Sequence, residues 1–156
     1  METPIRVALI EDDRRLRDSL SALLAGSPGF SCLAVADSVE EALRQRLAQP
    51  PDVLLLDIHL PGMPGSLGAR HLAERWPLAV ILIHTVHEED DKVFASLCNG
   101  AVGYILKRTP PARLLEAIRE ARDGGAPMSP EIARKVITLF RRIAPPSEPR
   151  TPLAPQ

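Results

Sequence analysis

The chain has few cysteines, no long apolar run and no leader-like start. Its 156 residues include two cysteines, which are too few for a disulfide framework. Because Cys32 and Cys98 lie inside apolar runs, we expect both to be small core residues in a reducing cytoplasm. No apolar stretch approaches the roughly 18 residues of a membrane span. Acidic residues come too early in METPIRVALIEDD for a signal peptide. We therefore expect a cytoplasmic protein without a membrane partner.

The chain also lacks an overall excess of one charge, since its formal net charge is −1. The charge is nevertheless uneven. Residues 1–125 hold 14 basic and 18 acidic residues, whereas residues 126–156 hold 5 and 2. The length fits one domain with a sizeable core, and the basic tail indicates a separate unit.

Apolar runs of strand length alternate five times with patterns of helical spacing. Such repeated βα units predict an α/β fold: a doubly wound (βα)5 parallel sheet with right-handed crossovers and helices on both faces. The near-continuous apolar strands agree, because parallel strands are buried on both sides. The expected strands are residues 5–10, 30–36, 52–56, 79–83 and 102–106, and the expected helices are 16–24, 39–47, 67–76, 88–98 and 111–122.

The carboxyl ends of the predicted strands carry polar side chains. In doubly wound sheets the site lies outside this edge. Carboxylates placed together repel one another, and a hard divalent cation bound by oxygen ligands relieves that repulsion. A Mg²⁺ ion facing a lysine would neutralise a phosphoryl group, so Asp57 is the candidate nucleophile for an aspartyl phosphate. The set comprises Glu11-Asp12-Asp13 after the first strand, Asp57 after the third, Thr85 after the fourth and Lys107 after the fifth.

Each of these residues alone has an ordinary structural explanation. A carboxylate at a strand end is commonly a helix cap or a solvated loop acid, and we expect Asp13 and Asp52 to be of that kind. A single lysine there is commonly solvated, and a single threonine commonly caps a helix. The functional interpretation therefore depends on the whole set falling at one sheet edge.

Four segments together resemble the signature of response-regulator receiver domains of two-component signalling. They are VALIEDD, LLLDIHLPGMPG, ILIHT and GYILKRTPP, within a resemblance that spans about residues 4–125. The stretch GYILKRTPPARLLEAIREARDGG resembles the NarL/FixJ (LuxR-type) subfamily. The resemblance implies the flavodoxin-like strand order 2-1-3-4-5 and a receiver domain over residues 1–125. It also implies that the protein is a phosphoacceptor and not an enzyme.

The resemblance also assigns roles at the site. Asp57 would accept a phosphoryl group from a histidine kinase, and the domain would catalyse its own phosphorylation and dephosphorylation. Asp12 would bind Mg²⁺ directly, Glu11 would hold it through water, and the backbone carbonyl of His59 would be a further ligand beside Asp57.

A second group of roles concerns signalling. Lys107 would pair with the phosphoryl oxygens, and Thr85 would bond to the phosphate and shift toward it. Tyr104 would be the switch aromatic that turns inward when Thr85 moves. A homodimer formed on phosphorylation and control of transcription are the implied outputs.

Three residues depart from the family pattern or flank its reactive centre. The residue after the switch hydroxyl is usually small, but here it is Val86, whose branched side chain would crowd the path to the phosphoryl group. His59 and His87 lie two positions past Asp57 and Thr85, and the resemblance implies that these positions flank the water that hydrolyses the phosphoryl group. The ordinary explanation for both is a solvated loop histidine.

Residues 126–143 are expected to form a C-terminal linker-helix unit, with Ser129 as N-cap and Pro130 as the first helical residue. Its apolar stripe favours docking against the receiver or a second copy. Residues 144–156 are expected to be a proline-rich linker, since 145–156 hold five prolines. The LuxR-type family places a helix-turn-helix output domain after such a linker, so DNA contact would need that absent domain. The chain is then a truncated regulator or a stand-alone receiver acting through protein contacts or phosphorelay.

Three other classes remain as alternatives. A phosphatase of the haloacid-dehalogenase type also uses a strand-end aspartate with Mg²⁺, but it needs an aspartate where His59 stands. A flavodoxin needs a phosphate-cradling first loop, and here that loop is Glu11-Asp12-Asp13-Arg14-Arg15. A receiver that signals without phosphorylation would not need the complete residue set.

Overall fold

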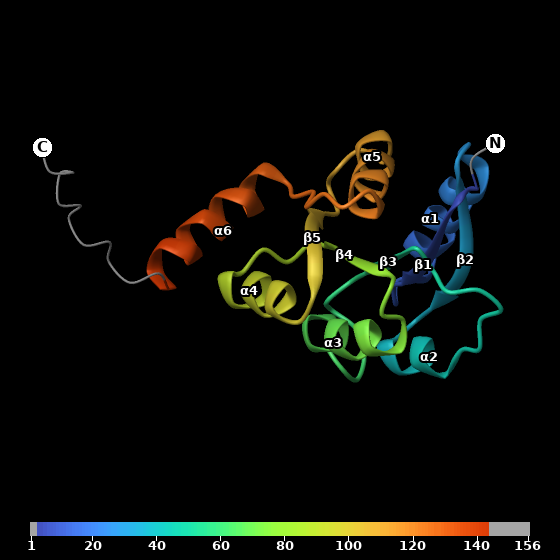
Figure 1. Ribbon diagram of the computed structural model, residues 1–156, viewed down its shortest axis with the longest axis horizontal. Coiled ribbons are helices and arrows are strands. Elements are labelled where there is room, and N and C mark those ends of the chain that lie inside the picture. The colour runs from blue at the N-terminus through green and yellow to red at the C-terminus, as the bar shows by residue number, and fades with distance from the viewer. Residues whose placement is uncertain (1–2, 144–156) are drawn as a thin grey trace, which may run out of the picture.

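A computed structural model of the chain describes residues 3–143. Five strands alternate with five helices, and a sixth helix follows (Figure 1). The strands are β1 (Ile5–Ile10), β2 (Phe30–Ala36), β3 (Val53–Leu56), β4 (Val80–Thr85) and β5 (Ala101–Leu106). The helices are α1 (Arg14–Gly26), α2 (Val39–Arg44), α3 (Gly65–Arg75), α4 (Asp90–Cys98), α5 (Pro111–Arg122) and α6 (Pro130–Ile143).

All five strands are parallel, and their order across the sheet is β2-β1-β3-β4-β5. The predicted (βα)5 fold and its strand order are therefore confirmed. Reversal of the order around β1 places the carboxyl ends of β1, β3, β4 and β5 at one edge, where such folds hold their sites.

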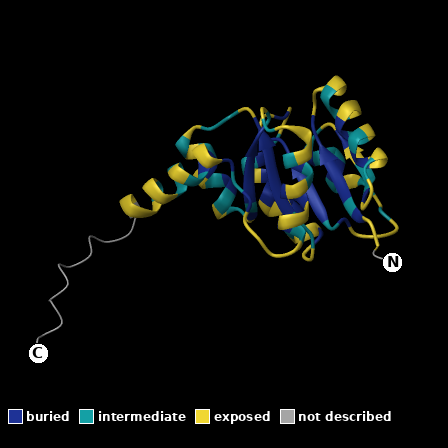
Figure 2. Ribbon diagram, turned by 90° about the horizontal axis from the view of Figure 1, so that it is seen from above, coloured by how far each residue is buried: buried dark blue, intermediate teal, exposed yellow. Residues whose placement is uncertain are grey.

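The sheet separates two apolar cores, and Figure 2 shows its strands as the most buried part of the molecule. Side chains alternate across each strand, so Val7 and Leu9 of β1 face α1 and α5, while Ala8 and Ile10 face α2, α3 and α4. Burial on both sides explains why the strands are continuous apolar runs.

A short segment before α6 lies along the outer side of β5. Tyr104 donates its backbone N–H to the Pro127 carbonyl at 3.0 Å and accepts from the Ser129 N–H at 3.1 Å. A Cβ atom at Gly103 would collide with the Pro127 carbonyl oxygen, so glycine permits this close approach. The segment therefore satisfies backbone groups that an edge strand would otherwise leave open.

Helix α6 begins where the sequence predicts, at Pro130, but Ser129 does not cap it with its side chain. The Ser129 hydroxyl accepts a hydrogen bond from the Leu106 N–H at 3.0 Å, while its backbone carbonyl accepts from Ile132 and Ala133. Ile132 is fully buried in the core on the α4 side. The expectation that this helix packs on the receiver is thus met by docking against α4.

One prediction about the core is wrong. Cys98 is exposed, whereas Cys32 is half-buried and packs at the margin of the core on the α1 side. No helix within residues 3–143 combines the length and apolarity needed to cross a membrane. The predicted linker over residues 144–156 lies outside the described residues.

Candidate functional site

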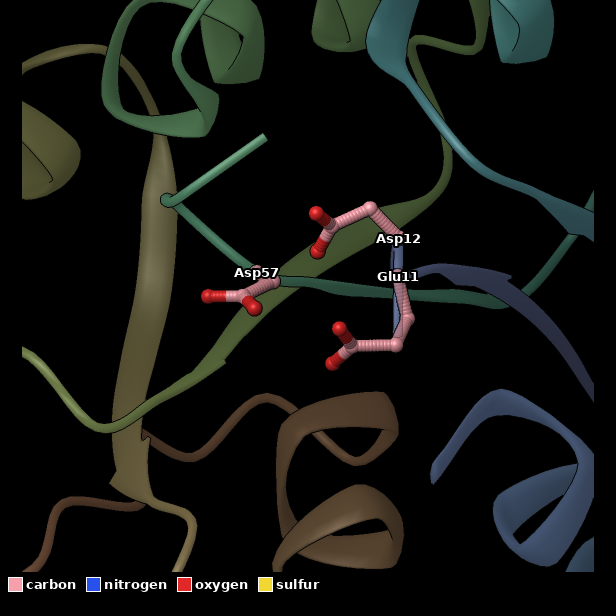
Figure 3. A group of neighbouring side chains, drawn as sticks. All are labelled: Glu11, Asp12 and Asp57. Atoms are coloured by element: carbon pink, nitrogen blue, oxygen red, sulfur yellow. The ribbon is translucent and has the colours of Figure 1, made fainter. Parts of the chain in front are cut away.

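Three carboxylates converge at the carboxyl edge of the sheet. Glu11 and Asp12 follow β1, and Asp57 follows β3. Each offers an oxygen atom that lies within 4.8 Å of the other two (Figure 3). Glu11 and Asp57 are buried, whereas Asp12 is exposed. The predicted cluster is therefore assembled, with one acid open to solvent.

Lys107, which directly follows β5, joins two of these acids. Its Nζ atom lies 2.7 Å from Asp57 Oδ2 and 2.7 Å from Glu11 Oε1. One ammonium among three carboxylates leaves two negative charges, which one divalent cation would neutralise. Oxygen-only donors of this kind suit a hard cation such as Mg²⁺. The residues present therefore fit such an ion.

Burial and charge act in opposite directions on the site's titrations. Burial raises the pKa of Glu11, and the nearby Asp57 charge adds to this, against the hydrogen bond from Lys107. For Asp57, burial is outweighed by the hydrogen bond and charge of Lys107, with further bonds from Thr85 and the His59 N–H, so its pKa is lowered. Burial works against the Lys107 charge, but Asp57 and Glu11 raise its pKa. Asp57 is therefore held ionised, as a nucleophile requires.

Backbone groups fix the carboxylates in place. The His59 N–H donates to Asp57 Oδ1 at 3.2 Å, and the Asp13 N–H donates to Glu11 Oε2 at 3.0 Å. A Cβ atom at Gly65 would collide with the Asp57 carbonyl oxygen, so only glycine lets α3 start this close. Steric contact with the backbone of Asp57 thus explains the glycine at position 65, at the end of the turn.

The two acids expected to be structural are placed as such. Asp13 caps α1 by accepting from the Leu16 N–H at 3.2 Å. Asp52 lies at the opposite end of β3 and accepts from the Arg6 N–H at 2.8 Å. Asp52 also pairs with the Arg6 guanidinium at 3.2 Å.

Thr85 and Tyr104 are connected through the loop between β4 and α4. Thr85 is fully buried at the end of β4, and its Oγ1 accepts from the His87 N–H at 3.3 Å. The Tyr104 ring is also fully buried, and its hydroxyl donates to the His87 carbonyl at 2.6 Å. Both predicted switch residues therefore contact the same residue of this loop.

The residues that depart from the family pattern lie on the rim. Val86 is 65% exposed, and His59 is exposed. The rings of His59 and His87 face each other, with their centroids 5.2 Å apart. His87 also approaches Glu89, with Nδ1 at 3.4 Å from Oε1. The two histidines belong to loops after different strands, which bring them together beside the acidic cluster.

Two further residues at the site were not predicted from the sequence. His84 lies inside β4 next to Thr85, and it lines the space around Glu11 and Asp57. Burial, followed by the charge of Lys107, lowers its pKa to about 4. Arg17 of α1 donates to the Glu11 carbonyl at 2.9 Å. A histidine in an otherwise apolar strand was the available signal for the first of these.

Comparison with known proteins identifies the family to which this fold belongs. The model of the response regulator receiver domain matches residues 7–119. The chain belongs to the response-regulator receiver family. Receiver domains bind Mg²⁺ at an acidic pocket, and here Glu11, Asp12 and Asp57 form a cluster that suits a metal. Response regulators are signalling proteins and not classical enzymes, and their partners are typically histidine kinases.

The individual relatives include a transcriptional regulatory protein and a response regulator. The receiver is 31% identical over 142 residues to the transcriptional regulatory protein DegU of Brevibacillus brevis, and 34% identical over 132 residues to the response regulator GacA of Pseudomonas viridiflava. These matches cover 91% and 85% of this chain, but only 60% and 62% of the relatives. The chain thus spans about three fifths of their length.

Solved structures agree with this assignment. A LuxR-family response regulator from Aurantimonas sp. SI85-9A1 superposes with a TM-score of 0.80 at 31% identity, covering 91% of this chain and 100% of that one. The receiver domain of the putative response regulator NarL from Mycobacterium tuberculosis gives 0.73 at 28% identity, covering 79% and 99%. The predicted kinship with the LuxR/NarL class of receivers is confirmed.

Proposed function

We propose that this receiver is phosphorylated on Asp57 by a histidine kinase and thereby controls an output. The observation that carries the proposal is the position of the Asp57 carboxylate, which is buried, held ionised and 2.7 Å from the Lys107 ammonium. In the reaction, the phosphorus–nitrogen bond of the kinase's phosphohistidine breaks and a bond from phosphorus to an Asp57 oxygen forms. The electron pair of the broken bond returns to the imidazole.

The metal would be held by Glu11, Asp12, Asp57 and the backbone carbonyl of His59. A bound Mg²⁺ supplies charge neutralisation for the transferring oxygens. The exposed position of Asp12 supports direct binding at the open side of the cluster. Glu11 is already engaged by Lys107 and by the Asp13 N–H, which supports a more distant role through water.

Lys107 would pair with the phosphoryl oxygens and neutralise their charge. Its pairing with both Asp57 and Glu11 holds the ammonium in place before the reaction, so no large rearrangement is needed. Thr85 would then hydrogen-bond to a phosphoryl oxygen. Because Thr85 shares His87 with Tyr104, such a movement would reach the loop before α4 and the backbone of β5.

The output is proposed from the relatives. Several are transcriptional regulatory proteins, and this chain covers their receiver portion. We propose that the receiver controls transcription through a DNA-binding segment, with phosphorylation promoting a homodimer. The receiver itself would contact the kinase and a second receiver, and not DNA.

The test is phosphoryl uptake from acetyl phosphate with Mg²⁺, followed by intact mass. The parent chain should gain one acid-labile phosphoryl group, and Asp57→Asn should gain none. Asp52→Asn is the matched control, because Asp52 lies at the other end of the same strand. It should be labelled like the parent. Undiminished labelling of a folded Asp57→Asn chain would refute the assignment.

A further inference from the structure

Helices α4 and α6 form an apolar groove that their own packing does not fill. The groove has a volume of about 260 Å³. Phe140 is 70% exposed, Ile137 beside it 52%, and Phe94 42%. Figures 1 and 2 show α6 extending past α4 with an exposed outer surface. The lining residues are Phe94, Leu97, Cys98, Val136, Leu139 and Phe140.

The two borders of this groove carry opposite charges. On α4, Asp91 shares a helical face with Phe94 and Cys98, since they recur at intervals of three and four residues. On α6, Arg141 shares a face with Ile137 by the same spacing. Both Asp91 and Arg141 are exposed, and neither forms an ion pair within residues 3–143. The apolar centre is therefore flanked by an acidic border on α4 and a basic border on α6.

Several other charges of this region are paired within the chain, whereas Lys92 and Arg134 form no ion pair within residues 3–143. Asp90 accepts from Lys135 at 3.0 Å and lies 3.6 Å from Arg142. Arg108 joins Glu131 at 2.7 Å and Glu88 at 3.4 Å. These pairs join α6 to the start of α4 and to Arg108. Asp91 is available to a partner on α4, and Arg134 and Arg141, which share a helical face, are available on α6.

We propose that this α4–α6 face binds the same face of a second copy of the chain. A two-fold axis through the apolar centre superposes the basic border of each copy on the acidic border of the other, as an isologous interface requires. Phe140 of each copy would then enter the groove beside Phe94 and Cys98 of its partner. The arrangement buries the exposed rings and pairs Arg141 with Asp91 twice.

The inference deepens the proposed homodimer by naming its face, and it rests on that part of the proposed function. A second receiver is favoured over a nucleic acid or an anionic lipid surface because the face has an acidic border on one side of its apolar centre and a basic border on the other. A polyanion would be repelled by the acidic border.

The experiment is sedimentation equilibrium of the full 156-residue chain, with and without acetyl phosphate and Mg²⁺. The parent should dimerise, and Phe140→Asp should abolish the dimer. Arg141→Asp and Asp91→Arg should each weaken dimerisation ~3–10-fold, as for partly exposed ion pairs present twice. The double variant, Arg141→Asp with Asp91→Arg, should restore it, because the pair is re-formed with its signs exchanged.

Two control variants show that the effect is local. Leu78→Asp places the same charge on another exposed apolar residue, and Arg46→Asp makes the same charge reversal on a distant loop. Both should dimerise like the parent. Thermal unfolding of each variant shows whether it is folded.

Three results would overturn the inference. They are a parent that stays monomeric up to about 1 mM in both conditions, a dimer indifferent to Phe140 and Arg141, and a double variant that fails to regain dimerisation. Phosphoryl uptake is measured on the same samples. A chain that is labelled on Asp57 but fails these tests refutes the face alone, whereas an unlabelled chain refutes the proposed function.

Discussion

The Tyr104 hydroxyl and the His87 carbonyl are joined by a hydrogen bond of 2.6 Å. The bond ties the middle of β5 to the loop between β4 and α4, and it holds the phenol ring fully inside the protein. The same residue, His87, donates its N–H to Thr85. The switch aromatic is therefore inward in this structure. Its movement in response to Thr85 stays a prediction.

Tyr104→Phe should destabilise the fold and loosen this loop. The substitution keeps the buried ring but removes the donor to His87, and such a loss costs about 1 kcal/mol in the free energy of unfolding. Urea denaturation measures the change, and hydrogen exchange of residues 86–91 should increase. Unchanged exchange there would show that the bond does not hold the loop.

Asp12→Ala should weaken Mg²⁺ binding far more than Asp13→Ala. Asp12 offers an oxygen to the cluster, whereas Asp13 turns its carboxylate to the N-terminus of α1. Asp13→Ala should instead lower the free energy of unfolding by about 1 kcal/mol, through the lost cap. Titration calorimetry and urea denaturation separate the two effects. Equal losses of metal affinity would place the metal one residue further along the chain.

Val86→Ala should speed both phosphorylation by acetyl phosphate and loss of the phosphoryl group. Val86 is 65% exposed beside Thr85, and a branched side chain there would obstruct in-line approach to Asp57. We expect up to about a tenfold change, a barrier difference of about 1.4 kcal/mol. Mg²⁺ affinity should stay the same.

Two time courses, uptake and decay after removal of the donor, test this effect. Val35→Ala is the matched control, since Val35 is an exposed valine on β2. If both rates equal those of the parent, the size of Val86 has no role. A change in decay alone would instead indicate His87, which lies beside the expected path of the hydrolytic water.

His84 should make the protein less stable as the pH falls from 7 to 5. Its pKa is lowered from 6.5 to about 4 in the folded chain, chiefly by burial. The unfolded chain therefore binds a proton at His84 below about pH 6.5, whereas the folded chain binds it only below about pH 4. The free energy of unfolding consequently falls as the pH is lowered from about 6.5 to about 4. Linkage gives a loss of about 2 kcal/mol between pH 7 and pH 5.

Urea denaturation at the two pH values, on the parent and on His84→Leu, isolates this contribution. Other groups titrate equally in both chains, so the difference between their pH dependences belongs to His84. The parent should lose about 2 kcal/mol more than the variant. Equal losses in the two chains would mean that His84 does not resist protonation.

The fold was predictable from sequence because its signal is local. Runs such as 53–56 are buried on both faces of a parallel sheet, and helical spacing marks the intervening segments. The ends of the helices were less predictable. Periodicity predicts helices over 39–47 and 88–98, whereas α2 stops at Arg44 and α4 starts at Asp90. The exposure of Cys98 was missed because an apolar run does not reveal which face of its helix is covered.

The proximity of the candidate site residues was predictable from sequence, but their hydrogen bonds to the rest of the fold were not. The set from Glu11 to Lys107 follows from the strand ends that topology brings together. The hydrogen bond from the Leu106 N–H to the Ser129 hydroxyl could not be predicted in this way. It joins residues that are distant in sequence, and every residue except proline has a backbone N–H, so the sequence gives no sign of the donor. The burial of His84 likewise depends on how α1 and α5 close over β4.

Because residues 127–129 pair with β5, a small rotation at this point would be amplified along the length of α6. The 14 residues of the helix extend about 21 Å at the usual rise, so a tilt of about 10° at Ser129 displaces its far end by about 4 Å. The pivot bonds to the backbone of Tyr104 itself. A small shift of β5 would therefore displace Arg142, near the far end of α6, by about the size of a side chain. Because Arg142 pairs with Asp90, the displacement would also reach α4.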